Sequence, residues 1–449
     1  MGKILLVQQY LGNNHEVGPI FPLGLAYLAT AIHNSTSWDI KAIDMNVYDE
    51  PYKELDTVLS SYQPNVVALS LRNIDNVDYE DFNYFYLELK PVAQTIKKYN
   101  CHLIVGGAGY SIFAKEIIER NHEIDYGLVQ EGEETIVELL NSIDNALPVN
   151  KIKGLYYRES SCIKYTGDRP PLNFSNSSIP IRDYFDTEKY LKPLCLGVQT
   201  KRGCSLKCSY CTYPYLSKNT ERFRNPESVI DEIEELVEKY GAKEIIFCDD
   251  IFNVPVEHSI RIIQGIIDRG IVVKWSAWFD IANTTEDFMR LAIQSGCYRF
   301  CFSTEGVTDK SLTLLKKNFS VSQADRLIRL CGNKEFKCID FRFSLFAMPP
   351  GQTIYGMIKT ICIVFITHVL RKNSKCLVSW IRILPNTELF RTYRNGTMEL
   401  LPEQINDKTK DSLFYNNLSY PSGLLYLYKK ILSLMGPMRE LRKKAFSRK

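Results

Sequence analysis

The stretch that organises this chain is Cys204-Ser205-Leu206-Lys207-Cys208-Ser209-Tyr210-Cys211. Its three thiols are spaced four and three residues apart, so they can converge on three corners of a cubane iron–sulfur cluster, which soft thiolate ligands hold well. The fourth corner then lacks a protein ligand. An iron with an open site can bind and activate a small molecule, whereas a cluster held by four thiolates only carries electrons. The spacing therefore predicts a cluster with a reactive corner.

Length and composition indicate a soluble enzyme of two or three domains, because 449 residues exceed one ordinary hydrophobic core. A net charge of +3 gives no indication of a polyanionic partner, so we expect no nucleic acid. The 13 scattered cysteines and the absence of a secretory pattern in the first residues favour a reducing, cytoplasmic location. The apolar stretch 358–370 is about half the length of a bilayer span and contains Lys359 and His368, which favours a buried amphipathic helix.

The first 145 residues alternate short β-rich runs with helical patterns, which predicts a parallel sheet covered by helices on both faces. The expected strands are residues 3–8, 39–44, 65–71, 102–105 and 126–129. The expected helices are residues 23–32, 84–98, 112–120 and 133–143. This rhythm predicts a Rossmann-like or flavodoxin-like sheet, in which ligands bind beyond the carboxyl ends of the strands.

A hairpin at 153–165 and a Pro- and Ser-rich linker up to residue 193 precede a second βα series. Its expected strands are residues 196–201, 243–248, 272–277, 299–303, 338–345 and 377–383. Its expected helices are residues 226–240, 256–269, 285–295, 322–333 and 354–369. We therefore expect a first domain at 1–150, a hairpin and linker at 151–195, a second domain at 196–390 and a small helical region at 391–449.

The cysteine triplet resembles the signature of the radical S-adenosylmethionine (SAM) superfamily. The resemblance implies a partial (β/α)6 barrel and a [4Fe-4S] cluster held by Cys204, Cys208 and Cys211, whose open iron binds SAM and cleaves it to a 5′-deoxyadenosyl radical. The side chains that it places around SAM are Tyr210, Asp249, Ser303, Glu305 and Arg342. Three of them have a structural alternative, which is ring packing for Tyr210, a solvated acidic turn for Asp249 and an ion pair with Asp340 or Glu305 for Arg342.

Residues 22–29, 105–107 and 130–133 resemble, in this order, the cobalamin-binding domain that precedes one large class of radical SAM domains. The positions that the resemblance implies around cobalamin are Ser70, Gly106, Gly107, Gly109, Gln130 and Gly132. His15 lies where some cobalamin domains carry a histidine ligand to cobalt, although the surrounding Asn13-Asn14-His15-Glu16-Val17-Gly18 departs from that motif. A solvent-facing loop histidine is the alternative.

The two resemblances together imply C-methylation of an unactivated carbon in a small-molecule or lipid-like substrate, with a flavodoxin-type or other electron donor. A radical cyclisation or ring rearrangement without net methyl transfer is the alternative within the family, and a non-catalytic cobalamin or redox sensor is the alternative outside it. An RNA-modifying methylthiotransferase would need a second cysteine triplet upstream, where Cys101, Cys162 and Cys195 are too far apart.

The sequence does not decide the roles of two further features. Six further cysteines fit a protein core, although one of them could act as a hydrogen donor in the active site: Cys248, Cys297, Cys301, Cys331, Cys338 and Cys362. The basic end of the chain, from Arg439 to Lys449, is either a solvated tail or a contact with an anionic membrane or a lipid-like substrate. The sequence does not indicate an oligomeric state.

Overall fold

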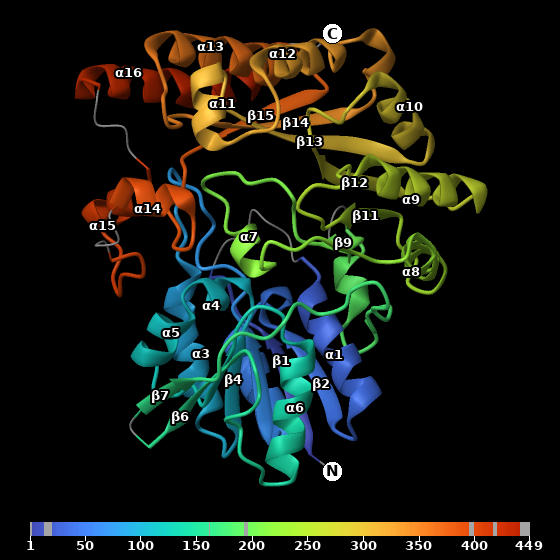
Figure 1. Ribbon diagram of the computed structural model, residues 1–449, viewed down its shortest axis with the longest axis vertical. Helices are drawn as coiled ribbons and strands as arrows, with labels where there is room; N and C mark the ends of the chain where they lie inside the picture. The colour runs from blue at the N-terminus through green and yellow to red at the C-terminus, as the bar shows by residue number, and fades with distance from the viewer. Residues whose placement is uncertain are drawn as a thin grey trace.

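The computed structural model describes residues 2–12, 20–160, 162–192, 196–394, 399–415 and 420–440. Two α/β units lie one above the other, and the segment with the three cysteines runs between them (Figure 1). The predicted fold class, a doubly wound α/β domain followed by a partial barrel and a helical C-terminal region, is confirmed.

The N-terminal sheet has seven strands in the order β2-β1-β3-β4-β5-β6-β7. The five parallel strands match the predicted ones within a residue or two: β1 Lys3–Gln8, β2 Asp39–Asp44, β3 Val66–Ser70, β4 His102–Gly106 and β5 Tyr126–Leu128. The hairpin expected before the linker, β6 Leu155–Glu159 and β7 Cys162–Tyr165, pairs antiparallel with β5 and extends this sheet. The hairpin is therefore part of the first sheet.

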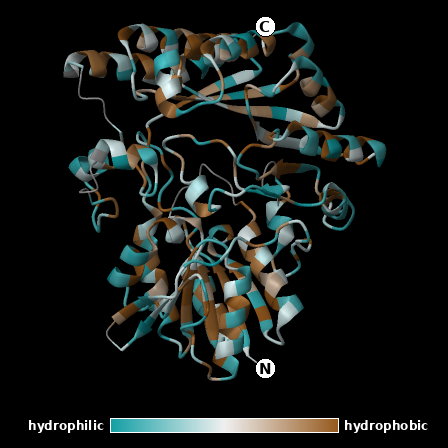
Figure 2. Cartoon of the chain, viewed as in Figure 1, coloured by the Kyte–Doolittle hydropathy of each residue, from teal (hydrophilic) through white to brown (hydrophobic). Residues whose placement is uncertain are grey.

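Helices cover both faces of this sheet, as its fully buried strands require. Leu6 of β1 packs with α1 Leu23–Ser35 and α6 Glu133–Asp144 on one face. Its neighbours Leu5 and Val7 point to the other face. The helices there are α2 Pro51–Tyr62, α3 Leu89–Ile96 and α5 Ala114–Arg120, and α4 Ala108–Ile112 follows β4. Figure 2 shows the hydrophobic residues concentrated along the strands between these layers.

The sequence prediction missed α2, although its signals are present. Pro51 occupies the first turn, where its missing N–H costs no hydrogen bond, and Leu55, Val58 and Leu59 form the buried stripe. The remaining residues of this helix are mostly polar, so the apolar stripe is narrow and easily overlooked.

The second sheet has six parallel strands in the order β15-β14-β13-β12-β11-β8. They are β8 Gly197–Val198, β11 Glu244–Phe247, β12 Lys274–Phe279, β13 Cys297–Glu305, β14 Asp340–Phe346 and β15 Ser374–Ser379. Its helices are α8 Pro226–Glu238, α9 Val256–Asp268, α10 Glu286–Gln294, α11 Asp309–Leu315, α12 Val321–Leu330 and α13 Ile354–Val364. Two expectations were wrong here: α11 was not predicted, and β15 begins three residues before the predicted strand at 377.

Strands β13 and β14 of this sheet alternate between aromatic and mostly polar side chains in their central parts. Phe300, Phe302, Phe341 and Phe343 are buried against the helices, where their rings lie 5.8 to 6.2 Å apart in successive pairs. The residues between them are half-buried and face the other side: Arg299, Cys301, Ser303, Arg342 and Ser344. The inner face of β13 and β14 is therefore mostly polar.

The C-terminal region contributes α14 Glu388–Arg394, α15 Asp407–Leu413 and α16 Ser422–Ser433. Arg382, which follows β15, forms a fully buried ion pair with Asp75 of the N-terminal unit, with 2.8 Å between Nε and Oδ2. No helix of the described residues is both long enough and apolar enough to cross a bilayer.

A second buried charge cluster joins the linker to the barrel. Glu232 of α8 is completely buried between two guanidinium groups, Arg182 of the linker at 2.5 Å and Arg224, which follows β10 Arg222–Phe223. A carboxylate in this position neutralises charges that water cannot reach.

Removing the Glu232 carboxylate should destabilise the folded protein. We expect Glu232→Ala to lower the free energy of unfolding by about 3–5 kcal/mol, because it leaves two guanidinium groups buried without a counter-ion. Urea titration followed by far-ultraviolet circular dichroism measures the change. The matched control is Glu234→Ala on the same helix, whose ion pair with Arg269 is solvent-exposed and should contribute about 0.5 kcal/mol or less. Equal losses in the two variants would contradict this account.

Candidate active site between two strand edges

The cysteine loop follows the short strand β9 Lys201–Arg202 and leads into α7 Tyr213–Leu216. Backbone hydrogen bonds of Ser209 fix it in place: its N–H donates to the carbonyl of Leu315 at 3.1 Å, and its own carbonyl accepts from Leu389 N–H at 2.7 Å. Gly203 begins the loop at φ +89°, and a Cβ there would lie 2.0 Å from the carbonyl oxygen of Thr220. Only glycine fits this position.

The three thiols of the loop are half-buried and free of disulfides. Burial raises the pKa of Cys204 to about 11 and raises those of Cys208 and Cys211, and the charge of Cys208 also raises the pKa values of Cys204 and Cys211. No three His, Cys, Asp or Glu side chains of the described chain converge as ligands of one metal ion do. A cubane takes its thiolates at separate corners, so the donor set fits a cluster, and the ligand role of the three residues stays a prediction.

The turn after β11 carries two adjacent carboxylates with different surroundings. Asp249 accepts hydrogen bonds from the Thr200 N–H at 2.8 Å, the Thr200 hydroxyl at 2.5 Å and the Lys201 N–H at 3.2 Å. Its carboxylate therefore holds the strand that leads into the cysteine loop. Burial raises the pKa of Asp249 to about 6, against the effect of these hydrogen bonds.

Within the described part of the chain, Asp250 shows no such hydrogen bonds. Its Oδ2 is buried without a hydrogen bond, and burial together with the charge of Asp249 raises the pKa of Asp250 to about 7. The carboxylate lies close enough to Cys204 and Cys211 to raise their pKa values as well. Sequence reasoning named Asp249 as the SAM contact, and the structure makes Asp250 the carboxylate with an unused acceptor beside the thiols.

The structure brings Tyr210 and Glu305 together, and their roles at SAM stay predictions. The Tyr210 hydroxyl donates to the Glu305 carboxylate, which also pairs with Lys317 at 2.8 Å. The ring of Tyr210 packs edge-on against Phe346 at 5.0 Å. Both readings of Tyr210, a site residue and a packing ring, are thus compatible with its position beside the cysteines.

Arg342 lies on the polar inner face with Ser303, as predicted from the burial of Phe341 and Phe343. Its guanidinium is paired with Asp340 at 2.7 Å, which is the structural alternative that the sequence left open. Ser303 lies beside Ser344 in the strand register, two residues closer to the carboxyl edge than Arg342. Cys301 shares this inner face, whereas Cys297 and Cys331 are buried.

The predicted cobalamin positions gather at the carboxyl edge of the N-terminal sheet. Ser70 of β3 lies beside Gly106 of β4. A Cβ on Gly107 would lie 2.7 Å from the carbonyl oxygen of Leu71, and one on Gly109 would lie 2.8 Å from the backbone of Asn73. These glycines let two strand tips approach each other closely. Their contacts with cobalamin stay predictions, and His15 lies outside the described residues.

The loop after β5 connects this edge to the barrel. The Gln130 amide donates to the carbonyl of Tyr215 in α7 at 2.7 Å, and Gly132 packs against Leu28. Glu131 pairs with Arg222 at 2.7 Å and with Arg202 at 3.2 Å. Burial alone would raise the pKa of Glu131, but the Arg222 hydrogen bond and the Arg202 charge outweigh it and lower the pKa.

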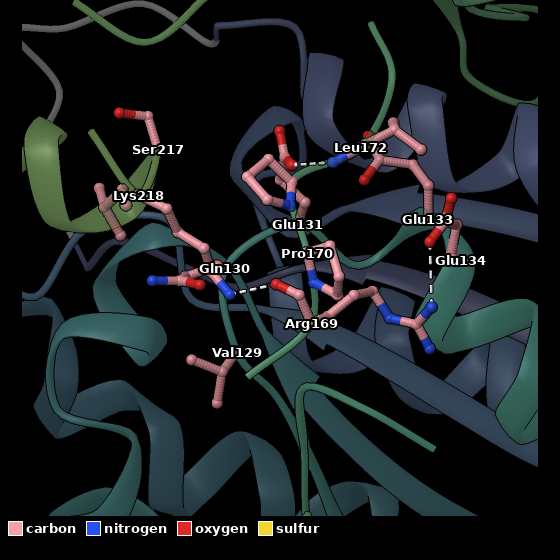
Figure 3. Close-up of a pocket in the computed structure, with 12 residues that line it drawn as sticks. Val129, Gln130, Glu131, Glu133, Glu134, Arg169, Pro170, Leu172, Ser217 and Lys218 are labelled. Atoms are coloured by element: carbon pink, nitrogen blue, oxygen red, sulfur yellow. Dashed lines mark hydrogen bonds and ion pairs between the residues drawn. The ribbon is translucent and has the colours of Figure 1, made fainter. Parts of the chain in front are cut away.

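A small pocket opens beside these contacts (Figure 3). Glu131 accepts a hydrogen bond from the Leu172 N–H at 2.9 Å, Lys218 donates to the carbonyl of Arg169, and Arg169 pairs with Glu134 at 3.0 Å. The linker is thus tied to the first unit and to the end of α7, and the polar groups that line this pocket already have partners.

Comparison with known families finds matches in two separate parts of the chain. The B12 binding domain matches residues 15–140, and the Radical SAM superfamily matches residues 198–357. The chain therefore joins a B12-binding domain to a radical SAM domain. These domains imply cobalamin, SAM and a [4Fe-4S] cluster as its cofactors, as predicted.

Several related proteins match the chain at low identity. The chain is 27% identical over 307 residues to the uncharacterized methyltransferase PH0819 of Pyrococcus horikoshii, covering 68% of this chain and 64% of that protein. It is 25% identical over 320 residues to the anaerobic magnesium-protoporphyrin IX monomethyl ester cyclase of Cereibacter sphaeroides, covering 69% and 51%. The aligned regions thus span between half and two thirds of the length of these relatives.

The solved structure of the radical SAM methyltransferase TsrM from Kitasatospora setae, with cobalamin and a [4Fe-4S] cluster bound, has the same fold. The two chains superpose with a TM-score of 0.74 at 20% identity, over 87% of this chain and 74% of TsrM. The cobalamin-dependent SAM radical enzyme OxsB superposes with a TM-score of 0.71 at 17% identity, over 93% and 64%.

Proposed function

We propose that this protein is a cobalamin-dependent radical SAM methyltransferase that methylates an unactivated carbon of a small-molecule substrate. The main support for the proposal is that the cysteine loop lies where the carboxyl edges of the two sheets come together. The cysteine loop lies between the carboxyl edge of the barrel and that of the B12-binding sheet, and α7 at the end of this loop contacts Gln130. Ligands of such sheets bind at these edges, so SAM and cobalamin would face one another.

Relatives support methyl transfer over the alternatives. PH0819 is named a methyltransferase, and so is the cytidylyl-2-hydroxyethylphosphonate methyltransferase of Streptomyces wedmorensis, 21% identical over 75% of this chain and 72% of its own length. The cyclase relatives keep radical cyclisation as the second candidate. A sensor without chemistry would not need a polar inner face beside the cysteine loop, although it would still bind cobalamin.

The residues of the chain have distinct tasks in this proposal. A cluster on Cys204, Cys208 and Cys211 would supply the electron that cleaves SAM, and bound cobalamin would supply the methyl group. Asp250 would accept a hydrogen bond from the methionyl amino group with its unused Oδ2. Glu305 is held by Lys317 and Tyr210, so it would keep a fixed carboxylate at the edge of β13.

We expect a flavodoxin-type or other reductant as electron donor, a cytoplasmic location and no nucleic acid partner. The substrate would enter between the two domains and bind against the inner face of the barrel. Arg299 and Arg342 share one carboxylate there, Asp340, at 2.7 Å from each. The inner face thus offers hydrogen-bond donors as well as hydroxyl groups from Ser303 and Ser344.

The cluster assignment is tested by Cys208→Ala. We expect anaerobically reconstituted variant protein to lose the broad absorbance near about 400 nm and to stop forming 5′-deoxyadenosine, since two thiolates cannot hold the cubane. Cobalamin should stay bound, because its domain is intact. The control is Cys338→Ala, a solvent-exposed cysteine outside the loop. SAM cleavage that persists in Cys208→Ala would refute the assignment.

The role of Asp250 predicts a pH dependence of SAM binding. Its pKa of about 7 means that the carboxyl is neutral below that pH and ionised above it, and only the ionised form pairs with the cationic cosubstrate. The dissociation constant of SAM should therefore fall as the pH rises toward 7, by up to about tenfold per unit. Asp250→Asn should bind more weakly and remove this slope.

Equilibrium dialysis of SAM at about pH 6 and about pH 8 measures the effect. Asp287→Asn serves as the control, because Asp287 is exposed in the first turn of α10 and should leave the slope unchanged. If Asp250→Asn kept the slope of the unaltered protein, another group would bind the amino end of SAM.

A further inference from the structure

A buried ammonium group lies beside the cysteine loop. Lys317 follows α11, and only 6% of its side chain is exposed. Its Nζ pairs with the Glu305 carboxylate at 2.8 Å, and the Tyr210 hydroxyl donates to the same carboxylate oxygen. Tyr210 stands between Cys208 and Cys211 in the chain. The ion pair is therefore attached to the loop that carries the thiols.

The backbone holds Lys317 in this place. α11 ends at Lys316, which has φ +56°, and the N–H of Lys317 donates to the carbonyl of Leu312 at 3.0 Å. This hydrogen bond closes a Schellman turn, which is a common end of an α-helix. The carbonyl of Leu315, the last helical residue, accepts a hydrogen bond from the Ser209 N–H at 3.1 Å. The turn that positions the ammonium is thereby joined to the middle of the cysteine loop.

The positive end of this ion pair acts on one thiol more strongly than the negative end. Burial raises the pKa of Cys208, the charge of Lys317 lowers it, and the opposite influence of Glu305 is weaker than that of Lys317. The ammonium therefore lies closer to this sulfur than the carboxylate does. Burial alone would lower the pKa of Lys317, but the charges of Glu305 and Cys208 outweigh it and raise the pKa. Asp280 is a further carboxylate with a smaller influence on Lys317.

The other two thiols have a different charge beside them. Burial raises the pKa values of Cys204 and Cys211, and the charge of Asp250 raises both further. Lys201 opposes this effect at Cys204, where its influence is smaller than that of Asp250. A cluster held by the three thiolates would thus have an ammonium beside its Cys208 corner and a carboxylate beside the other two.

We propose that Lys317 raises the reduction potential of the cluster, so that it takes up an electron more readily from a low-potential donor. This inference rests on the proposed function, because it needs a cluster on the three cysteines. One-electron reduction adds a negative charge to a cluster without making or breaking a bond, and a nearby ammonium stabilises that charge. The Lys317 and Glu305 side chains are almost completely buried, so salt and water screen this effect little.

Anaerobic redox titration of the reconstituted full-length protein tests the proposal, with dithionite as the electron donor, redox mediators present and SAM left out. The electron paramagnetic resonance signal of the reduced cluster gives the reduced fraction without any turnover. We expect Lys317→Met to lower the potential, with an about tenfold smaller ratio of reduced to oxidised cluster at a given potential, which equals about 59 mV for one electron. Lys317→Arg should keep the potential, because it keeps the charge.

Two further variants separate the effect of charge from a merely structural role. Glu305→Gln should raise the potential, because the ammonium then lacks its counter-charge, whereas loss of a purely structural ion pair gives no reason for shifts of opposite sign. Lys316→Met is the matched control. The Lys316 side chain is 49% exposed and pairs with Glu388 at 2.5 Å, so water screens its charge and the potential should stay unchanged.

An intact cluster with an unchanged potential in Lys317→Met would overturn the proposal, as would equal shifts in Lys317→Met and Lys316→Met. If Lys317→Met retains no cluster, Glu305→Gln decides, and an unchanged or lower potential in that variant overturns the proposal. Failure of the unaltered protein to bind a cluster would instead contradict the proposed function itself.

Discussion

Ion pairs between carboxylates and guanidinium groups that are shielded from water fix how the two domains meet. Glu131 of the B12-binding domain lies between Arg202 and Arg222, and Asp75 pairs with Arg382 from the segment after the barrel. An unmatched buried charge costs several kcal/mol, so the domains can pack closely only in the orientation that satisfies these groups. That orientation turns the carboxyl edges of both sheets toward each other. In the proposed function, the predicted SAM and cobalamin sites on the two sheets would thereby face each other.

The packing of the two domains also fixes the position of the cysteine loop. Arg202 immediately precedes the loop and Arg222 follows it, so the Glu131 contacts hold both of its flanks. Ser209 in its centre is held by backbone hydrogen bonds to Leu315 and Leu389, which belong to the barrel and to the C-terminal helices. Three separate parts of the chain therefore position the thiols. A loop fixed by its surroundings can present three ligands without reorganising when a cluster binds.

The sequence predicted the elements whose apolar pattern is strong and missed the helices α2 and α11. The parallel strands came within a few residues because their apolar runs are bounded by turn residues. The last barrel strand was displaced, since the apolar residues after Ser379 resemble strand residues but lie in irregular chain. Asp249 and Asp250 differ by one position, and that position decides which carboxylate accepts hydrogen bonds from Thr200 and which keeps an oxygen without one. Neither pattern nor composition contains that information.

The sequence also does not predict the left-handed backbone conformation of two residues. Gln130 has φ +66° at the end of β5, and Glu305 has φ +57° at the end of β13, a conformation that side chains other than glycine rarely adopt. Glycine would relieve the strain at either place, but it would lose the contact of Gln130 with Tyr215 or that of Glu305 with Lys317. Strained non-glycine residues persist where the surrounding structure over-determines them. At these two strand edges, local backbone stability is given up for the position of a side chain.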